Sequence, residues 1–500
     1  MSYWLGVDVG TGGTRALLVD ASGRLRHAVS SPHEDMRMER PLWAEQRPEN
    51  WWDAAQDAIR RVLAEAGVSG NDVRGIGLSG QMHGLVMLDA SNRVIRPALI
   101  WCDQRSQHQV DSINSSVGRE TVLSCIANPV LTGFTLPKLL WVRDNEPAHF
   151  ERVKKMLLPK DYLRFCLAAE HACDVSDASG TALFDVVKRR WSWELAERVG
   201  VNRSILPDVF ESTAVSGKVS RDAAAATGLA EGIPVVAGAG DQAASAVGNG
   251  IVTTGNVSCT LGTSGVMFAH IQSPAYDPAG RVHTFCHAVD GAWHVMGVTQ
   301  GAGLSLQWFR NNLAPGTGYD ALTAEAATAP AGSQGLFWLP YLMGERTPHL
   351  DATARGGWIG LTAKHTRADL IRSILEGVSY SMKDCLDIIE QMGVTATSVR
   401  FSGGGARSEF WQQMMADVLG KPVSVLENQE GSAYGAALLA LVGTGQYSSV
   451  AEVCKAAIRE VRSIEPRAAE HKLYAAGHRI YRSLYPALKG NNILDASNTP

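Results

Sequence analysis

Residues 5–15 read LGVDVGTGGTR, and the rest of the fold is organised around this stretch. A short apolar strand carrying one acid, Asp8, runs into a turn of Gly and Thr, and a second apolar strand follows at residues 16–19. Glycines let a backbone approach a ligand closely, and free N–H and hydroxyl donors bind anions. The turn therefore predicts a phosphate cradle, in which Asp8 could hold a divalent cation on the phosphate oxygens. An ordinary glycine-rich hairpin is the alternative, although an unpaired acid in an apolar strand is costly to bury.

The composition is that of a globular protein without a polyanionic partner. Hydrophobic residues make up 45% of the 500 residues, charged residues 19%, and the net charge is -4, which predicts no binding to nucleic acid or to an acidic membrane surface. There is no signal-peptide pattern and no run near the roughly 18 apolar residues of a membrane span. Eight cysteines without a CxxC pair and fourteen histidines without HExxH spacing predict reduced thiols and no structural zinc. A cytoplasmic enzyme of two or three domains is therefore expected.

The first half of the chain predicts a meander of strands followed by a helix. After the opening hairpin a third strand is expected at residues 25–30, and a helix is expected at residues 48–65, where proline suits the first turn. Apolar side chains recur there at helical spacing and are interpreted as core: Trp52, Ala55, Ile59, Val62, Leu63 and Ala66.

The segment SGQMHG at residues 79–84 follows an apolar strand at residues 73–78 and carries groups suited to a polyol. Gln81 and His83 stand between glycines on a loop that permits close approach of a ligand. A histidine at a strand end is more often a satisfied structural residue, and that alternative stays open for His83.

Two further segments carry polar residues that have both a ligand-binding and a structural interpretation. In IWCDQR, residues 100–105, Asp103 and Arg105 offer an acceptor and a forked donor to a sugar, or they form a local surface ion pair. In TGFTLPKLLWVRD, residues 132–144, a turn leads into a helix on which Lys138 reaches either a ligand or solvent.

An acid follows a glycine-rich strand end in IPVVAGAGDQAA, residues 233–244. Gly238 and Gly240 clear space beside Asp241 where a small-residue helix begins. A substrate hydroxyl next to a general base requires such space, so Asp241 is a candidate base. A simple helix N-cap is the alternative.

The opening pattern returns half a chain later. Residues 256–261 predict a strand, GTSG at residues 262–265 a turn, and residues 266–269 a second strand. We interpret this echo as an internal duplication, in which two related domains close around a nucleotide. The predicted division is an N-terminal domain at residues 1–248, a C-terminal domain at residues 249–488 and a polar tail at residues 489–500.

A third glycine segment, SGGGARS at residues 402–408, lies between a predicted strand and a helix. This arrangement lets a nucleotide lie against the backbone, although a glycine triplet is weak evidence when it stands alone. The GxxxxGK[ST] pattern is absent, which excludes a P-loop protein, and no GxGxxG follows the first strand, which argues against a Rossmann site.

Taken together and in this order, the chain resembles the FGGY carbohydrate kinases through GVDVGTGGTR, SGQMHG, GFTLPKLLWVRDN, GAGDQAA, LGTSG, LPYLMGERTP and FSGGGARSEFWQQMMADVLG. GWIGLTAKHTRADLIRSILE, residues 357–376, is similar to the second signature of that family. The resemblance extends over about residues 3–484. It implies an α/β fold of two ribonuclease-H-like domains, of the actin and hexokinase type, with ATP and Mg²⁺ in the cleft between them.

The resemblance also implies roles for individual residues. Asp241 would be the catalytic base, and Asp8 would organise magnesium and phosphate, with both carboxylates counted as metal ligands. The expected sugar pocket comprises Gln81, Met82, His83, Asp103, Asp241 and Gln242. The expected nucleotide and phosphate site comprises Thr11, Gly12, Thr14, Thr263, Ser264, Trp308, Gly403, Gly404 and Ser408.

The implied activity is ATP-dependent phosphorylation of the terminal hydroxyl of a ketopentose. Some members of the family have Asp-Asn where this chain has Asp241-Gln242, and the longer amide can change sugar preference. Kinases for ribulose, gluconate or glycerol are therefore alternatives, and an actin-like ATPase without a sugar substrate is a more distant one. The expected partners are a small sugar and ATP, without nucleic acid or membrane. A homodimer is compatible with the sequence.

Overall fold

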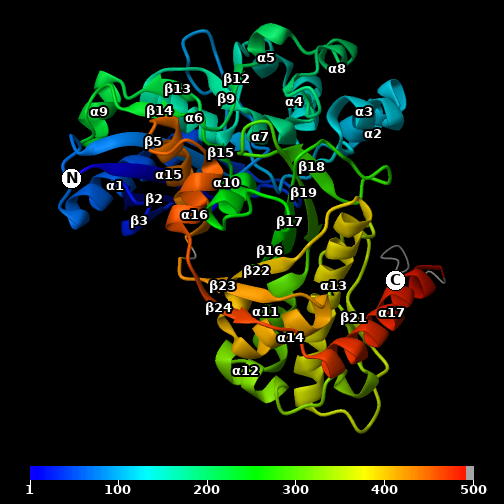
Figure 1. The fold of residues 1–500 in the computed structure, drawn as a ribbon. Coiled ribbons are helices and arrows are strands. Elements are labelled where there is room, and N and C mark those ends of the chain that lie inside the picture. The colour runs from blue at the N-terminus through cyan, green and yellow to red at the C-terminus, as the bar shows by residue number, and fades with distance from the viewer. Residues whose placement is uncertain (429, 491–500) are drawn as a thin grey trace.

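The computed structural model describes residues 1–428 and 430–490, which form two α/β domains stacked along one axis (Figure 1). Each domain is built on a seven-stranded sheet. Within the described residues, no helix is both long and apolar enough to cross a membrane.

The first sheet has the strand order β13-β14-β5-β1-β2-β3, and β15 pairs with β5. Strands β1, β2 and β3 form an antiparallel meander, while β5 runs parallel to β1 and β14 runs parallel to β5. The bounds are β1 Tyr3–Val9, β2 Gly13–Asp20, β3 Leu25–Pro32, β5 Val73–Gly80, β13 Val215–Lys218, β14 Pro234–Val236 and β15 Ala239–Gly240. The hairpin and meander predicted from the opening stretch are present.

Helix α1, Pro48–Ala66, packs on β2 and β3. Pro48 lies at its start, and Gly67 ends it in the left-handed conformation, which glycine adopts without strain. Its buried face includes Trp51, whereas Trp52, which was predicted to be core, is partly exposed. Adjacent tryptophans point to different faces of a helix, and only packing decides which one is buried.

The second sheet has the order β18-β19-β17-β16-β22-β23-β24. Here β16 is antiparallel to β17 and parallel to β22, as β1 is to β2 and β5. The bounds are β16 Asn256–Leu261, β17 Gly265–Ile271, β18 His283–Cys286, β19 Trp293–Thr299, β22 Ser398–Gly403, β23 Val423–Leu426 and β24 Glu460–Ile464. The two sheets therefore repeat one topology around the two Gly-Thr turns.

The remaining elements cover these sheets. The first half of the chain contributes α2 Gln107–Val117, α3 Arg119–Ile126, α4 Thr135–Asn145, α5 Pro147–Phe150, α6 Pro159–Ala168, α7 Val175–Ala178, α8 Trp193–Arg198, α9 Arg221–Thr227 and α10 Asp241–Gly248. Later in the chain come α11 Ala302–Leu313, α12 Tyr319–Ala326, α13 Arg367–Gln391, α14 Glu409–Leu419, α15 Gly431–Gly443, α16 Val450–Ala457 and α17 Ala468–Gly490. Short pairs are made by β4 Glu45–Gln46 with β7 Ala98–Leu99, β6 Val86–Leu88 with β8 Lys155–Leu157, β9 Ala172–Asp174 with β12 Asp208–Phe210, β10 Phe184–Asp185 with β11 Arg190–Trp191, and β20 Phe337–Leu339 with β21 Gly357–Ile359.

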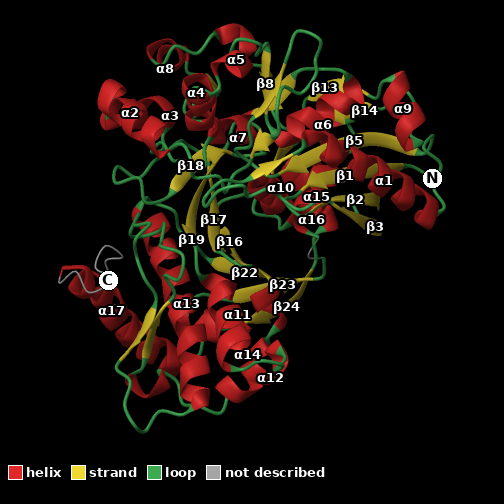
Figure 2. Cartoon of the chain, turned by 180° about the vertical axis from the view of Figure 1, so that it is seen from behind, coloured by secondary structure: helices red, strands yellow, loops and turns green. Residues whose placement is uncertain are grey.

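Helix α15 returns from the second half of the chain to the first sheet. It packs against α10, β1 and β5, and Figure 2 shows α10, α15 and α16 grouped beside the strands of the first sheet. A Cβ on Gly6 would collide with the carbonyl of Ala433, and one on Gly77 with that of Ala436, so these strands need glycine for the helix to approach. The division at residue 248 stays a prediction, but one late helix belongs in space to the first sheet. Residues 491–500 of the predicted tail lie outside the described residues.

Candidate active site

The phosphate turn joins β1 to β2 and is closed by a hydrogen bond from the Gly10 N–H to the Gly13 carbonyl, 3.0 Å long. A Cβ on Gly12 would meet nothing within 4 Å, so the turn presents bare backbone to open space. Asp8, just before the turn, accepts a hydrogen bond from the Ser79 hydroxyl at 2.8 Å. Burial raises the pKa of Asp8, although the Ser79 hydrogen bond and the charge of Arg15 oppose this rise. A desolvated carboxylate beside a bare turn is the arrangement that a cation and a phosphate would neutralise.

Thr11 and Thr14 have different places in this turn. The Thr11 hydroxyl accepts from the indole N–H of Trp101 at 2.9 Å and donates to Gln81 at 3.3 Å. Thr14 is fully buried, and its hydroxyl bonds the His33 ring at 2.8 Å. Because the hydroxyl of Thr14 faces the protein rather than the turn's open side, we leave Thr14 out of the phosphate site.

Gln81 forms hydrogen bonds with two residues of the phosphate turn. Its amide nitrogen donates to the Gly10 carbonyl at 3.3 Å and to Gln46 at 3.0 Å, and its oxygen accepts from Thr11. With its polar atoms used in this way, Gln81 supports the backbone of the phosphate turn, and it is not a sugar ligand in this arrangement. The partner Gln46 is 35 positions away, so the sequence carried no local sign of this contact.

Asp103 corrects a further prediction. Its carboxylate has no exposed surface and accepts from the Ala44 N–H at 2.7 Å and from the Arg105 guanidinium at 2.7 Å and 2.9 Å. Arg105 in turn stacks on the ring of Trp43, 3.7 Å from its centroid. The ion-pair interpretation therefore fits, although the pair is buried rather than at the surface, and no oxygen is left for a sugar.

Met82 and His83 lie where β5, the segment of α7 and the start of α10 converge. A Cβ on Gly240 would meet the Met82 side chain at 2.8 Å, and one on Gly180 would collide with the His83 ring. The His83 Nδ1 bonds the Gly180 carbonyl at 2.7 Å. Because a carbonyl only accepts, Nδ1 carries the proton and Nε2 is left as an acceptor. Burial lowers the pKa of His83 to about 3, so the ring is neutral at physiological pH.

Lys138 reaches neither ligand nor solvent. It is fully buried on α4, and its ammonium donates to the carbonyls of His83 at 3.0 Å and Gly133 at 2.6 Å. Burial lowers its pKa to about 7, with the charge of Asp103 acting in the opposite direction. His83 has a positive φ of 69°, which is uncommon for a residue with a side chain. Lys138 therefore holds the backbone that carries the His83 ring.

Asp241 is the first residue of α10, and the N-cap is Gly240 without any side-chain cap, so the N-cap alternative does not apply. Asp8 lies opposite Ser79 on β5, and Ala239 lies opposite the same Ser79 from the other side. The two carboxylates thus flank one end of β5. Burial and the charge of Asp8 raise the pKa of Asp241 to about 7, while hydrogen bonds from Gln242 oppose this rise.

The second domain carries a pocket of about 510 Å³ beside its own Gly-Thr turn. Of the predicted nucleotide residues, Thr263, Gly404 and Ser408 line this pocket. Ser408 also caps α14 by accepting from the Trp411 N–H at 3.3 Å. Ser264 and Gly403 do not line the pocket. Gly403 has a φ of 84° and packs against the carbonyl of Leu261, so it shapes the loop.

Trp308 is another correction. Its ring stacks on Trp338 with centroids 5.7 Å apart and packs against the core of the second domain, so it is not part of the pocket lining. The sequence instead missed lining residues contributed by α11, α12 and the loops before them: Gly303, Leu306, Gln307, Gly318, Tyr319 and Asp320. They form no motif, because they meet only when these helices pack beside the turn.

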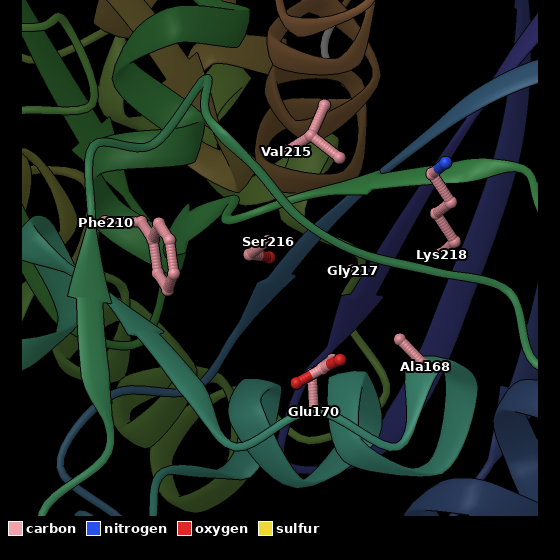
Figure 3. A pocket seen from close by; sticks show the side chains of 7 residues that line it. All are labelled: Ala168, Glu170, Phe210, Val215, Ser216, Gly217 and Lys218. Atoms are coloured by element: carbon pink, nitrogen blue, oxygen red, sulfur yellow. The ribbon is translucent and has the colours of Figure 1, made fainter.

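A different pocket, of about 500 Å³, lies between the end of α6 and the edge strand β13 (Figure 3). Glu170, Phe210 and Lys218 are among the side chains that line it. Every predicted site residue lies elsewhere, so this pocket has no place in the chemistry considered below.

The residues present fit magnesium and a nucleotide. Mg²⁺ keeps several waters and uses one or two protein carboxylates together with substrate phosphates, rather than an all-protein cage. Asp8 and Asp241 supply that number. No group of three or more His, Cys, Asp or Glu suited to a metal occurs in residues 1–428 and 430–490. Bare glycine turns in both domains offer room for phosphates.

Comparisons with known proteins give the chain's relationships. Residues 3–248 match the N-terminal domain, and residues 257–444 the C-terminal domain, of the FGGY family of carbohydrate kinases. Xylulose kinase of Bacillus subtilis is 37% identical over 492 residues, covering 98% of each chain. The crystal structure of xylulose kinase from Rhodospirillum rubrum superposes with a TM-score of 0.91 at 32% identity, over 98% of this chain and 99% of that one. A gluconate kinase from Lactobacillus acidophilus has a TM-score of 0.92 at 24% identity over 97% and 98%, so the fold alone does not select the sugar.

Proposed function

The chain belongs to the FGGY family of carbohydrate kinases, and from this premise we propose that it transfers the γ-phosphoryl group of ATP to the terminal hydroxyl of D-xylulose, giving D-xylulose 5-phosphate. The observation that carries the proposal is the placement of Asp8 and Asp241 on either side of β5, at the end where the phosphate turn lies. Phosphoryl transfer needs positioning and charge neutralisation more than covalent chemistry, and this arrangement supplies both.

Asp241 acts as the general base in this proposal. A base is most effective when its pKa is close to the working pH, and burial together with Asp8 raises the pKa of Asp241 to about 7. Its carboxylate accepts the proton of the terminal hydroxyl as that oxygen attacks phosphorus. Asp8 would hold a divalent cation, which would keep the negative charge of the transferred group near the turn.

The sugar lies against Met82 and His83. The neutral His83 ring accepts a hydrogen bond from a sugar hydroxyl at Nε2, because Nδ1 is occupied by the Gly180 carbonyl. Gln242, next to Asp241, is placed to influence which sugar fits. The Met82 side chain fills the space that a side chain at position 240 would need, and so it gives the pocket an apolar wall.

The nucleotide lies in the pocket of the second domain. Thr263 and the glycines of both turns face its phosphates, with Thr11 and Gly12 on the opposite side. Ser264 stays in the proposed phosphate set as part of the same turn. Bound Mg²⁺ would neutralise charge on the phosphate oxygens. Leu306, Gln307 and Tyr319 line the space beside Gly404 and Ser408 that an adenosine would fill.

Closure of the two domains completes the site. The two phosphate turns belong to different sheets, so binding of both substrates brings them together and excludes water, which limits wasteful hydrolysis of ATP. We place the reaction in the cytoplasm, where both substrates are available. A homodimer is the oligomeric state to test by light scattering after size-exclusion chromatography.

A panel of sugars with enzyme-coupled detection of ADP tests the proposal. We expect D-xylulose to have the highest kcat/KM, with magnesium required. A higher kcat/KM for ribulose, gluconate or glycerol would assign the enzyme to another sugar of the same reaction class. ATP hydrolysis that is independent of every sugar would contradict the kinase mechanism and favour an actin-like ATPase.

A further inference from the structure

A cluster of ionisable side chains without any exposed surface lies behind the active site: Lys160, Asp161, Arg164, Asp174 and Asp177. They come from α6, the end of β9 and α7. The Lys160 ammonium is 2.6 Å from Asp161, 3.1 Å from Asp174 and 3.8 Å from Asp177. Arg164 is 3.0 Å from Asp161.

This cluster is expensive to bury. Taking several charges out of water costs several kcal/mol per ion, and well-packed apolar residues often stabilise a fold equally well or better. Both carboxylate oxygens of Asp177 lack a hydrogen-bond partner in the described part of the chain. Burial raises the pKa of Asp177 well above its usual range, since the attraction of Lys160 only partly offsets it. Stability alone therefore gives little reason for the cluster.

Residues of the cluster and the neighbouring Ser176 form hydrogen bonds with the backbone of residues 237–240, which precede Asp241. At one end of this segment the carbonyl of Ala237 accepts hydrogen bonds from Lys160, at 3.4 Å, and from Arg164. At the other end the Gly240 N–H donates to the Ser176 hydroxyl at 3.1 Å. Gly240 is the residue immediately before Asp241.

Ser176 is itself fixed by Asp174. The Ser176 hydroxyl donates to Asp174 Oδ2 at 2.5 Å, and its backbone N–H donates to the same oxygen at 2.8 Å. The Ser212 hydroxyl donates to this oxygen as well, at 3.1 Å, and the Ser212 carbonyl accepts from the Gly238 N–H at 2.9 Å. Because the Ser176 hydroxyl donates its proton to Asp174, the oxygen of that hydroxyl is free to accept the hydrogen bond from the Gly240 N–H.

We infer that Ser176 and Asp174 are positioning residues for the catalytic step, which hold the Gly240 backbone so that the Asp241 carboxylate meets the substrate hydroxyl. The inference rests on the proposed function, because it requires Asp241 to be the base. The Met82 side chain also lies against Gly240, 2.8 Å from where a Cβ would stand, so the peptide contacts both an apolar side chain and a hydrogen-bonded serine. A misplacement of about 1 Å can reduce a rate on the order of a hundredfold.

Ser176→Ala is the direct test, with kcat and KM measured for the sugar and for ATP. We expect kcat to fall about 10- to 100-fold, while both KM values stay within about threefold because Met82, His83 and the nucleotide pocket are unchanged. Ser176→Thr, which keeps the hydroxyl, should recover most of the turnover.

Ser179→Ala is the matched control. Ser179 lies three positions along the chain and is also buried, but its hydroxyl bonds Val175 and Cys286 and does not touch residues 237–240. It should keep near wild-type kcat. Equal losses in the two alanine variants, or a loss expressed mainly in KM, would overturn the positioning role.

Asp241→Asn separates the inference from the proposed function. If Asp241→Asn is inactive and Ser176→Ala has wild-type kcat, the inference is wrong and the base assignment stands. If Asp241→Asn keeps its turnover, the base assignment within the proposed function is wrong, and the inference falls with it. Should Ser176→Ala fail to fold, Ser212→Ala loosens Asp174 from another side, and it must then show the same fall in kcat at constant KM for the inference to hold.

Discussion

Replacing Asp241 with Asn removes the proposed proton acceptor but keeps the size of the side chain. A general base contributes roughly a hundred- to ten-thousandfold to a rate, which corresponds to about 3–5 kcal/mol of transition-state free energy. We therefore expect kcat to fall within that range. The fold should not suffer, because burial and the charge of Asp8 both disfavour an ionised Asp241, and a neutral amide relieves both effects.

The assay is coupled ADP release at saturating D-xylulose and magnesium-ATP, combined with calorimetric sugar binding and a thermal melt. Sugar affinity should change little, since Met82 and His83 are intact. Asp222→Asn, on the exposed surface of α9, is the control for the same chemical change and should behave as wild type. A folded Asp241→Asn enzyme that turns over within about threefold of wild type would refute the base assignment.

Four further predictions follow from the site and its surroundings. For the wild type, the pKa of about 7 at Asp241 predicts that kcat/KM falls about tenfold per pH unit below that value, and a flat profile between pH 5 and 7 would contradict it. Asp8→Asn should need more magnesium for half-maximal activity and shift this acidic limb to lower pH, because a charge that raises the Asp241 pKa is gone; a wild-type magnesium titration would make Asp8 structural. Lys138→Met should raise the sugar KM about 5- to 30-fold, since the two hydrogen bonds that it removes from the His83 and Gly133 carbonyls are together worth about 1–2 kcal/mol; an unchanged KM would show that His83 needs no such support. Burial lowers the pKa of His83, His283 and His287 to about 3 and holds the pKa of His294 well below its usual value. Between about pH 6.5 and 3 the unfolded chain therefore binds protons that the folded chain does not, and the free energy of unfolding should drop as pH falls through this window by up to about 1.4 kcal/mol per pH unit per histidine. His294→Phe removes one of these histidines but keeps a ring against Phe268, so urea melts of this variant should show a shallower drop.

The sequence by itself determined the backbone features that depend on local chemistry. The Gly-Thr turns lie between apolar strands in both halves, and their repetition predicted the repeated topology that β1 and β16 share. Glycines and alternating apolar residues act within a few positions, so their consequences can be predicted without knowing the partners. The helix at residues 48–65 was predicted for the same reason, as its apolar spacing defines one buried face.

The tertiary structure decided which polar side chains face a cavity and which face another part of the protein. Asp103, Gln81 and Thr14 have the side-chain chemistry of ligand-binding residues, yet each finds protein partners instead. A buried donor or acceptor forms hydrogen bonds with the polar groups that pack against it, and those groups can come from residues far along the chain.

The contacts that hold the backbone before Asp241 could not be predicted from the sequence either, because they too join residues that are far apart along the chain. Ser176 and Gly240 are 64 positions apart, and α15 reaches the first sheet only after the chain has built most of the second domain. Nothing local distinguishes a serine that positions a backbone from one that caps a helix. The sequence could therefore predict Asp241 as the base, but only the packed structure shows which hydrogen bonds hold the backbone beside it.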